Sequence, residues 1–248
     1  MSLDERLKYV AMKARHKNIL GPWYKKWWGK IILLIIALVL ILLLISSLYI
    51  VNKVQEILAT QNQALTAQEL QDYIKTINGD GTNYSFGTNK PQVTIIEFGD
   101  FACPYSRESA PIIKSLAEEY KNKIKIIWRD YLRNEDSIDL ALSARCAGEQ
   151  GKFWEMHDAL FANQDSYTTN DSTRPNRLIT LAQSLKLDSK KFTDCLNSKT
   201  YLDQIKKDYA DGNKLEIAGT PTWFVNNYPF SGALSEQKFR ELISGLIK

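Results

Sequence analysis

The sequence predicts an α/β domain preceded by one transmembrane helix, and two observations support this fold class. Residues 31–51 form a run of 21 residues without a charged side chain, and a helix of that length spans about 30 Å, the hydrocarbon thickness of a bilayer. Further along, short β-branched runs and segments of helical periodicity follow one another. Their order is strand, helix, strand, a long helical stretch, strand, strand and helix, which is typical of an α/β domain.

The charged residues are distributed unevenly around the apolar run. Residues 1–30 contain eight Lys and Arg against Asp4 and Glu5, a net charge of +6, and because the whole chain has +4, the part after residue 51 has −2. The positive-inside rule therefore predicts that residues 1–30 are a cytoplasmic basic tail and that residues 52–248 lie outside the cytoplasm. Since the basic excess is confined to the tail, no nucleic-acid partner is expected.

The apolar run is compared with a cleaved signal peptide, whose apolar core would be about 7–15 residues long and would precede a cleavage site of small residues. Here the run is longer, and Ser47-Leu48-Tyr49 is a poor cleavage site. Trp27 and Trp28 stand just before it and suit the headgroup boundary. We therefore interpret residues 31–51 as an uncleaved signal anchor that contacts the lipid bilayer, in a single-pass protein of the cell membrane.

Residues 52–88 are interpreted as a connector between the anchor and the domain. Apolar residues such as Val54, Ile57, Leu70 and Ile74 recur at helical spacing among polar ones, which predicts a partly helical segment. A frayed stalk is the alternative. Turn-forming residues around 79–83 and 87–89 end the connector, so the domain is expected to cover residues 89–248.

The elements of the domain are read from periodicity and from their flanking turn residues. A helical crossover between the first two strands implies that these strands are parallel. We expect strands at residues 93–98, 123–129, 222–225 and 228–230, helices at residues 103–120 and 235–247, and a helical insertion at about 134–212.

Cys103 lies where the first strand gives way to the first helix. Pro104 fits the first turn of that helix, where its missing N–H costs nothing. A thiol at this position faces the unpaired N–H groups and the positive end of the helix dipole, and both favour the thiolate that attacks disulfides. Cys103-Pro104-Tyr105-Ser106 is therefore the candidate active site.

This motif, together with Thr220-Pro221 before the third strand, resembles the DsbA family of thioredoxin-fold thiol–disulfide oxidoreductases. The resemblance covers about residues 85–248 and implies a thioredoxin-like fold with a helical insertion. It also implies a cis Pro221 next to Cys103. Glu97 matches the buried acid of the family, and the segment from Cys146 to Trp154 with His157 matches the insertion. We expect His157 to serve in packing.

The other two cysteines, Cys146 and Cys195, both lie in the expected insertion. Cysteines outside the cytoplasm tend to oxidise, so we predict a structural disulfide between them, with Cys103 left free.

Ser106 departs from the Cys-x-x-Cys pattern of the family, whose second cysteine releases the substrate from a mixed disulfide. A serine hydroxyl cannot do so, although it could donate a hydrogen bond to the Cys103 thiolate. Three explanations are open: a monothiol enzyme, a site that has lost its activity, and a serine introduced to trap complexes.

The leading hypothesis is thiol–disulfide exchange on secreted or membrane proteins, closer to isomerisation or reduction than to net oxidation. A thiol of the substrate, a small-molecule thiol or a membrane redox partner would resolve the adduct. The alternative is a non-catalytic binding or chaperone module with a degenerate redox site. A third and weaker hypothesis is a monothiol site that holds an iron–sulfur cluster together with a partner thiol, because an oxidising compartment argues against such a cluster. No cofactor is expected, since no His, Cys, Asp or Glu set has metal-ligand spacing and no glycine-rich loop suits a nucleotide.

Overall fold

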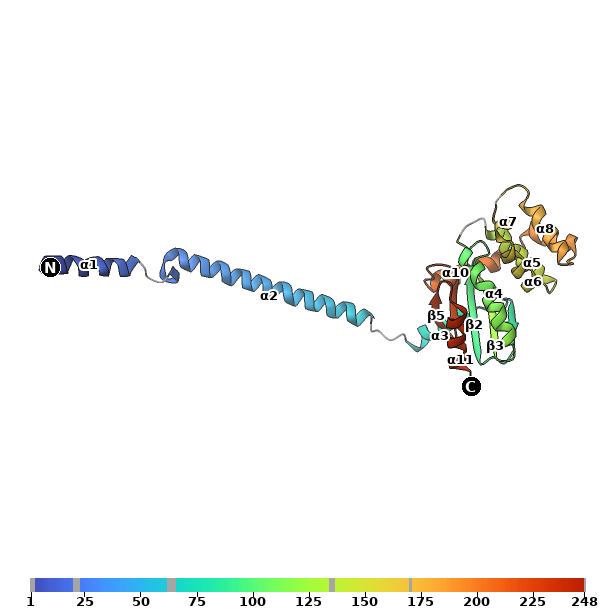
Figure 1. Cartoon of the computed structure of the whole chain (residues 1–248), viewed down its shortest axis with the longest axis horizontal. Helices are drawn as coiled ribbons and strands as arrows, with labels where there is room; N and C mark the ends of the chain where they lie inside the picture. The colour runs from blue at the N-terminus through green and yellow to red at the C-terminus, as the bar shows by residue number, and fades with distance from the viewer. Residues whose placement is uncertain (1–2, 20–22, 62–65, 134–136, 170, 248) are drawn as a thin grey trace. The chain divides into compact units, whose positions relative to one another are not determined.

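The computed structural model divides the chain into two compact units, Met1–Leu65 and Thr66–Lys248, which are described separately. The residues that the structure describes are 3–19, 23–61, 66–133, 137–169 and 171–247. Figure 1 shows the elements of both units.

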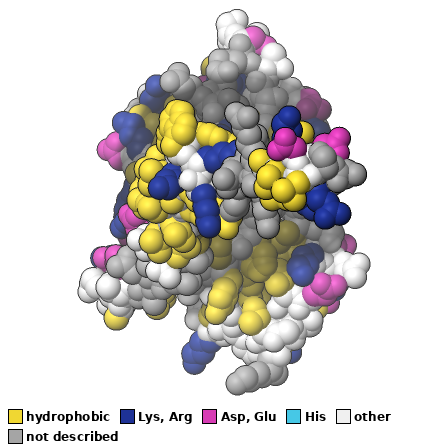
Figure 2. Space-filling model, turned by 90° about the vertical axis from the view of Figure 1, so that its left-hand side faces the viewer, with side chains coloured by type: hydrophobic (Ala, Val, Ile, Leu, Met, Phe, Trp, Pro, Cys, Tyr) yellow, Lys and Arg dark blue, Asp and Glu magenta, His cyan; other side chains and the backbone are white. Residues whose placement is uncertain are grey.

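The first unit consists of helix α1 (Leu3–Ile19), a short 3-10 helix (Trp23–Lys25) and helix α2 (Trp27–Gln61). Within α2, Trp27–Ile57 has a mean hydropathy of 3.4 and is long and apolar enough to cross a membrane. Its apolar side chains are exposed, Leu34 by 70% for example. Figure 2 shows hydrophobic side chains at the surface, with Lys and Arg among them, on the face turned to the viewer. Exposed apolar surface is unfavourable in water. The predicted apolar helix is therefore confirmed as the one candidate membrane span among the described residues, and it is longer than residues 31–51.

The second unit is built on one mixed sheet of five strands. Their order is β1-β3-β2-β4-β5. The pair β2–β3 is parallel, as the helical crossover predicted, and the other pairs are antiparallel. The strands are β1 (Ser85–Gly87), β2 (Val93–Gly99), β3 (Ile124–Asp130), β4 (Thr222–Val225) and β5 (Tyr228–Ser231).

Helices cover both faces of the sheet, and the alternation of side chains along β2 determines which face each residue meets. Val93 and Ile95 pack with helices α4 (Pro104–Glu119) and α11 (Glu236–Leu246). The intervening residues Ile96 and Phe98 pack on the opposite face, with α3 (Ala67–Asn78). The same alternation places Glu97 on the face that α4 covers.

The helical insertion forms a subdomain at one end of the sheet, where Figure 1 shows α5 to α8 gathered together. The predicted disulfide is confirmed: it joins Cys146 of α5 to Cys195 of α9, with Cα atoms 5.9 Å apart. The helices after β3 are α5 (Ile138–Glu149), α6 (Phe153–Ala162), α7 (Gln164–Thr168), α8 (Arg174–Ser184), α9 (Ser189–Ser198) and α10 (Leu202–Lys214).

The compact unit begins at Thr66, earlier than the boundary predicted at residue 89. Two elements of the expected connector belong to the domain. Helix α3 buries Ile77 completely, and β1 pairs with β3 at the edge of the sheet. Strand β1 is only three exposed residues long, so it carries no apolar run from which the sequence could have predicted a strand.

A buried cluster of charges links β3 to the helices. Arg129 Nε lies 2.6 Å from Asp208 Oδ1, and Arg145 Nη2 lies 2.5 Å from Asp208 Oδ2. Arg145 Nε also lies 2.5 Å from Asp130 Oδ2. Arg129 Nη1 donates to the carbonyls of α3 at Thr76 and Ile77. Since buried charges are tolerated only when they are paired, this cluster fixes α3, β3, α5 and α10 to one another.

Candidate active site

Cys103 is the N-cap residue of α4 and is half-buried, with a free thiol. Pro104 occupies the first turn of the helix, where no backbone N–H is required. The Cys103 N–H donates to the Asp100 carbonyl at 2.9 Å, and the Cys103 carbonyl accepts from the Arg107 N–H at 3.1 Å. The thiol is therefore held at the positive end of the α4 dipole, as the sequence predicted.

Two segments that are far apart in the sequence meet at the Cys103 sulfur. Cys103 Sγ donates to the Thr220 carbonyl oxygen at 3.1 Å, and the Thr220–Pro221 peptide bond is cis. Thr220 and Pro221 are buried, and the Pro221 carbonyl accepts from the Gly232 N–H at 2.8 Å. The structure therefore brings the thiol and the proline loop together, as the resemblance implied.

The other residues of the motif differ in their exposure. Pro104 and Tyr105 are exposed, Tyr105 by 60%, so both are accessible to a substrate. Ser106 is fully buried, and its Oγ has no hydrogen-bond partner among the described residues. The hydrogen bond that Ser106 could donate to Cys103 is therefore not formed, and the Cys103 sulfur donates to the Thr220 carbonyl instead.

Glu97 lies in β2 on the same face as α4 and is only 2% exposed. One carboxyl oxygen, Oε1, has no hydrogen-bond partner among the described residues. Burial raises the pKa of Glu97 well above its ordinary value, and the nearby Cys103 raises this pKa further. A raised pKa favours the neutral acid, so Glu97 opposes the formation of a thiolate less than an ionised carboxylate would.

Gly99 connects β2 to the active-site loop and shows why this position has no side chain. A Cβ atom here would lie 2.4 Å from Cη2 of Trp128, closer than packed carbon atoms approach. The indole of Trp128 stacks on Phe101 with ring centroids 4.6 Å apart. The absence of a side chain at Gly99 thus leaves room for the Trp128 indole, which packs against Phe101 of the loop.

Two residues that the sequence did not single out also hold this loop. Asp100 is buried and accepts from the N–H groups of Ala102 and Arg133 at 2.8 and 2.9 Å. Burial raises the pKa of Asp100. Gln164 of α7 donates to the loop carbonyls. Asp100 stands three residues before Cys103, and an aspartate in a turn commonly accepts from the N–H two residues on, so the sequence could have suggested its contact with Ala102. No local signal links Gln164 to the loop.

His157 packs inside the domain, as expected. Its ring is buried among aromatic rings that include Phe101 and Trp128. His157 Nδ1 lies 3.0 Å from Asp158 Oδ1, and burial lowers the pKa of His157.

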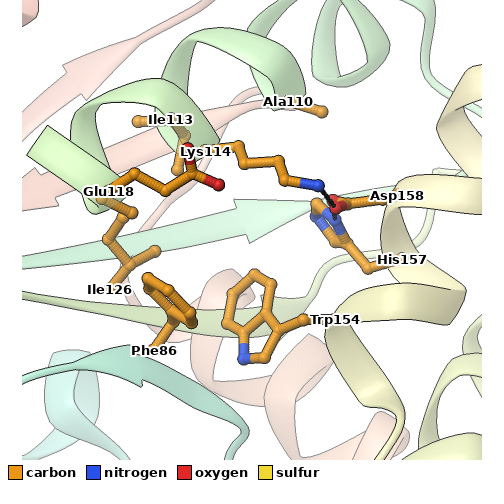
Figure 3. A pocket seen from close by; sticks show the side chains of 10 residues that line it. Phe86, Ala110, Ile113, Lys114, Glu118, Ile126, Trp154, His157 and Asp158 are labelled. Atoms are coloured by element: carbon orange, nitrogen blue, oxygen red, sulfur yellow. Dashed lines mark hydrogen bonds and ion pairs between the residues drawn. The ribbon is translucent and has the colours of Figure 1, made fainter. Parts of the chain in front are cut away.

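A pocket opens between α4, α6 and β1. Figure 3 shows the Lys114–Asp158 ion pair beside His157, with Phe86 and Trp154 across the pocket. Cys103 does not line this pocket, so the pocket is separate from the thiol site.

A mixed sheet, a thiol at the N-terminus of the following helix and a cis-proline loop against the sulfur together define a thioredoxin-fold thiol–disulfide oxidoreductase. The family model described as thioredoxin matches residues 79–244. The chain therefore belongs to the thioredoxin family, among its DsbA-like thiol–disulfide oxidoreductases.

Curated relatives match the thioredoxin domain. The chain is 30% identical over 152 residues to probable disulfide bond formation protein D of Bacillus anthracis, which is 58% of this chain and 70% of that protein. It is 25% identical over 203 residues to a putative protein-disulfide oxidoreductase of Rickettsia felis, covering 75% of this chain and 73% of that protein. A match to the Na(+)/H(+) antiporter NhaA 1 of Salinispora arenicola is 34% identical over 59% of this chain, but it spans only 22% of that relative's length.

Solved structures agree in fold. BdbD from Bacillus subtilis superposes with a TM-score of 0.60 at 24% identity, over 66% of this chain and 91% of that one. The thiol–disulfide exchange protein alpha-DsbA2 from Wolbachia pipientis gives a TM-score of 0.62 at 22% identity, over 71% and 93% of the two chains.

Proposed function

We propose that this chain is a membrane-anchored enzyme that exchanges thiols and disulfides of secreted or membrane proteins outside the cytoplasm. The observation that carries the proposal is the position of Cys103. Its free thiol sits half-buried at the N-terminus of α4, with Sγ 3.1 Å from the Thr220 carbonyl beside cis Pro221.

In the proposed reaction, the Cys103 thiolate attacks one sulfur of a substrate disulfide. A mixed disulfide forms between Cys103 and that sulfur, the substrate S–S bond breaks, and the second substrate sulfur leaves as a thiolate. Another thiolate then attacks the substrate sulfur of the adduct, forms a new disulfide and releases Cys103 as a thiolate. When the attacking thiolate comes from a third cysteine of the substrate, a different substrate disulfide forms, so the disulfide is isomerised and no net oxidation occurs.

Ser106 is the reason why we propose exchange with an external thiol. The residue is one helical turn beyond Cys103, where i and i+3 side chains are neighbours, and a cysteine at this position could resolve the adduct internally. With serine, resolution falls to the substrate, to a small-molecule thiol or to a membrane redox partner. Exposed Pro104 and Tyr105 would meet the substrate, while Thr220 and Pro221 would border its backbone.

Trapping of partners tests this proposal. The full chain should form mixed disulfides that persist on non-reducing gels, and Cys103→Ala should abolish them. Ser106→Cys should shorten their lifetime and confer dithiol oxidase or reductase activity, because the new thiol can displace the substrate. Absence of any adduct that depends on Cys103 would contradict the proposal.

The second candidate function is a non-catalytic binding module. The observation in its favour is that Ser106 donates no hydrogen bond to the Cys103 sulfur, which itself donates to the Thr220 carbonyl. This function predicts that Cys103→Ala binds the same client proteins as the wild type and complements a deletion strain. Loss of complementation in Cys103→Ala would exclude it.

The orientation of the chain completes the proposal. The net charge of +6 in residues 1–30 supports a cytoplasmic tail, with residues 31–51 of α2 in the bilayer and residues 52–248 outside. A tag fused to the C-terminus should be cleaved by protease added to intact spheroplasts. Protection of the tag until the membrane is dissolved would reverse this orientation.

A further inference from the structure

Helix α7 of the insertion contacts the active-site loop through one buried side chain. Gln164 is 3% exposed. Its Nε2 atom donates to the Phe101 carbonyl at 2.8 Å and to the Cys103 carbonyl at 2.9 Å. A side-chain amide nitrogen has two hydrogens to donate, so both are directed at the same loop.

These two carbonyls lie on either side of Ala102 and determine how the backbone enters α4. The Cys103 carbonyl is also the acceptor for the Arg107 N–H, a hydrogen bond of the first turn. The Cys103 side chain extends from this backbone, so the position of its sulfur beside the Thr220 carbonyl depends on how the backbone is oriented. Gln164 therefore acts on the sulfur through the backbone, without contacting the sulfur itself.

Gln164 also changes the electrostatics of the loop. Carbonyl oxygens carry partial negative charge, which disfavours a thiolate nearby, and a donor to each oxygen offsets that charge. Without the donors, buried carbonyls of the loop would lack hydrogen bonds that they now have. The electrostatic effect favours the Cys103 thiolate, the reactive form, when Gln164 is present.

A second contact between the same two helices provides a control. Arg107 of α4 and Asp165 of α7 form an ion pair at 2.9 Å, with side chains 41% and 90% exposed. Exposed ion pairs contribute little to stability. The buried amide, rather than this exposed pair, is thus the connection from α7 to the loop backbone.

We propose that Gln164 is a positioning residue through which the helical insertion orients Cys103 for attack on disulfides. The proposal rests on the proposed function, since it assigns Gln164 to the same reaction. It gives the insertion a part in the chemistry: α7 holds the backbone that aims the nucleophile.

The test measures the alkylation of Cys103 by iodoacetamide in the full chain in detergent, at pH 7 and at pH 10. Gln164→Met keeps the length of the side chain and removes both donors. We expect its rate at pH 7 to fall at least about fivefold, the factor for one hydrogen bond of ordinary net strength, because two are removed. At pH 10, where thiols are ionised in general, the rate should match that of the wild type. Asp165→Asn should match the wild type at both values.

Gln164→Glu is a second variant, which keeps the shape and replaces the donors with acceptors. It should react more slowly than Gln164→Met at pH 7. Equal rates in all variants at pH 7, or an equal fall in Asp165→Asn, would overturn the proposal. Equal loss at pH 7 and pH 10 would also overturn it, because that result indicates unfolding or lost access. Failure to trap substrates would refute the proposed function without affecting these rates.

Discussion

The disulfide between Cys146 and Cys195 should stabilise the domain strongly. It closes a loop with a sequence separation of 49 residues. In the chain-entropy model, a loop of that length stabilises the folded state by about 4 kcal/mol at 25 °C. Both cysteines are buried, 1% and 6% exposed, so replacing them with alanine also removes packing around α5 and α9. We therefore expect Cys146→Ala/Cys195→Ala to lose at least about 4 kcal/mol.

Urea unfolding of the full chain in detergent, followed by tryptophan fluorescence, measures this loss. With a dependence of about 2 kcal/mol per molar urea, the midpoint should fall by about 2 M. Excess reductant should lower the midpoint of the wild type but leave that of the double variant unchanged. A fall of less than about 0.5 M, or an equal response of both proteins to reductant, would refute the reasoning.

Three further predictions concern buried ionisable groups. Asp208→Asn removes the carboxylate shared by Arg129 and Arg145 and should cost about 3–5 kcal/mol in urea unfolding; a loss under about 1 kcal/mol would contradict this. Burial lowers the pKa of His157, so the unfolded chain binds the extra proton. Stability should therefore fall from about pH 7.5 to 5.5, and His157→Phe should reduce that slope. Burial raises the pKa of Glu97 above 4.5, so the folded chain retains the extra proton. Glu97→Gln should consequently gain stability over the wild type as pH rises, and parallel curves would exclude this.

The order of strands and helices could be predicted because each core element carries its own local signal. The β-branched run at residues 93–98 and the alternating run at residues 123–129 correspond to β2 and β3. Pro104 marks the start of α4, and Ser235 caps α11 by accepting from the Lys238 N–H. These signals depend only on neighbouring residues, so they can be recognised without the tertiary structure.

Other features could not be predicted because their partners are distant in the sequence. Strand β1 is a strand only because β3 pairs with it. Asp208 is 79 residues from Arg129, and neither position is unusual in its local pattern. Gln164 is a polar residue between two helices until the fold places it against the loop of Cys103.

The sequence by itself determined that one apolar helix precedes an α/β domain and that a single thiol stands at a helix N-terminus. Hydrophobic periodicity and helix-start residues are local, and they specify these features directly. Only the tertiary structure decided that the Cys103 sulfur faces the Thr220 carbonyl rather than Ser106, and that one Glu97 carboxyl oxygen has no hydrogen-bond partner among the described residues. Hydrogen-bond partners and burial depend on which segments pack together, and packing is a property of the whole fold.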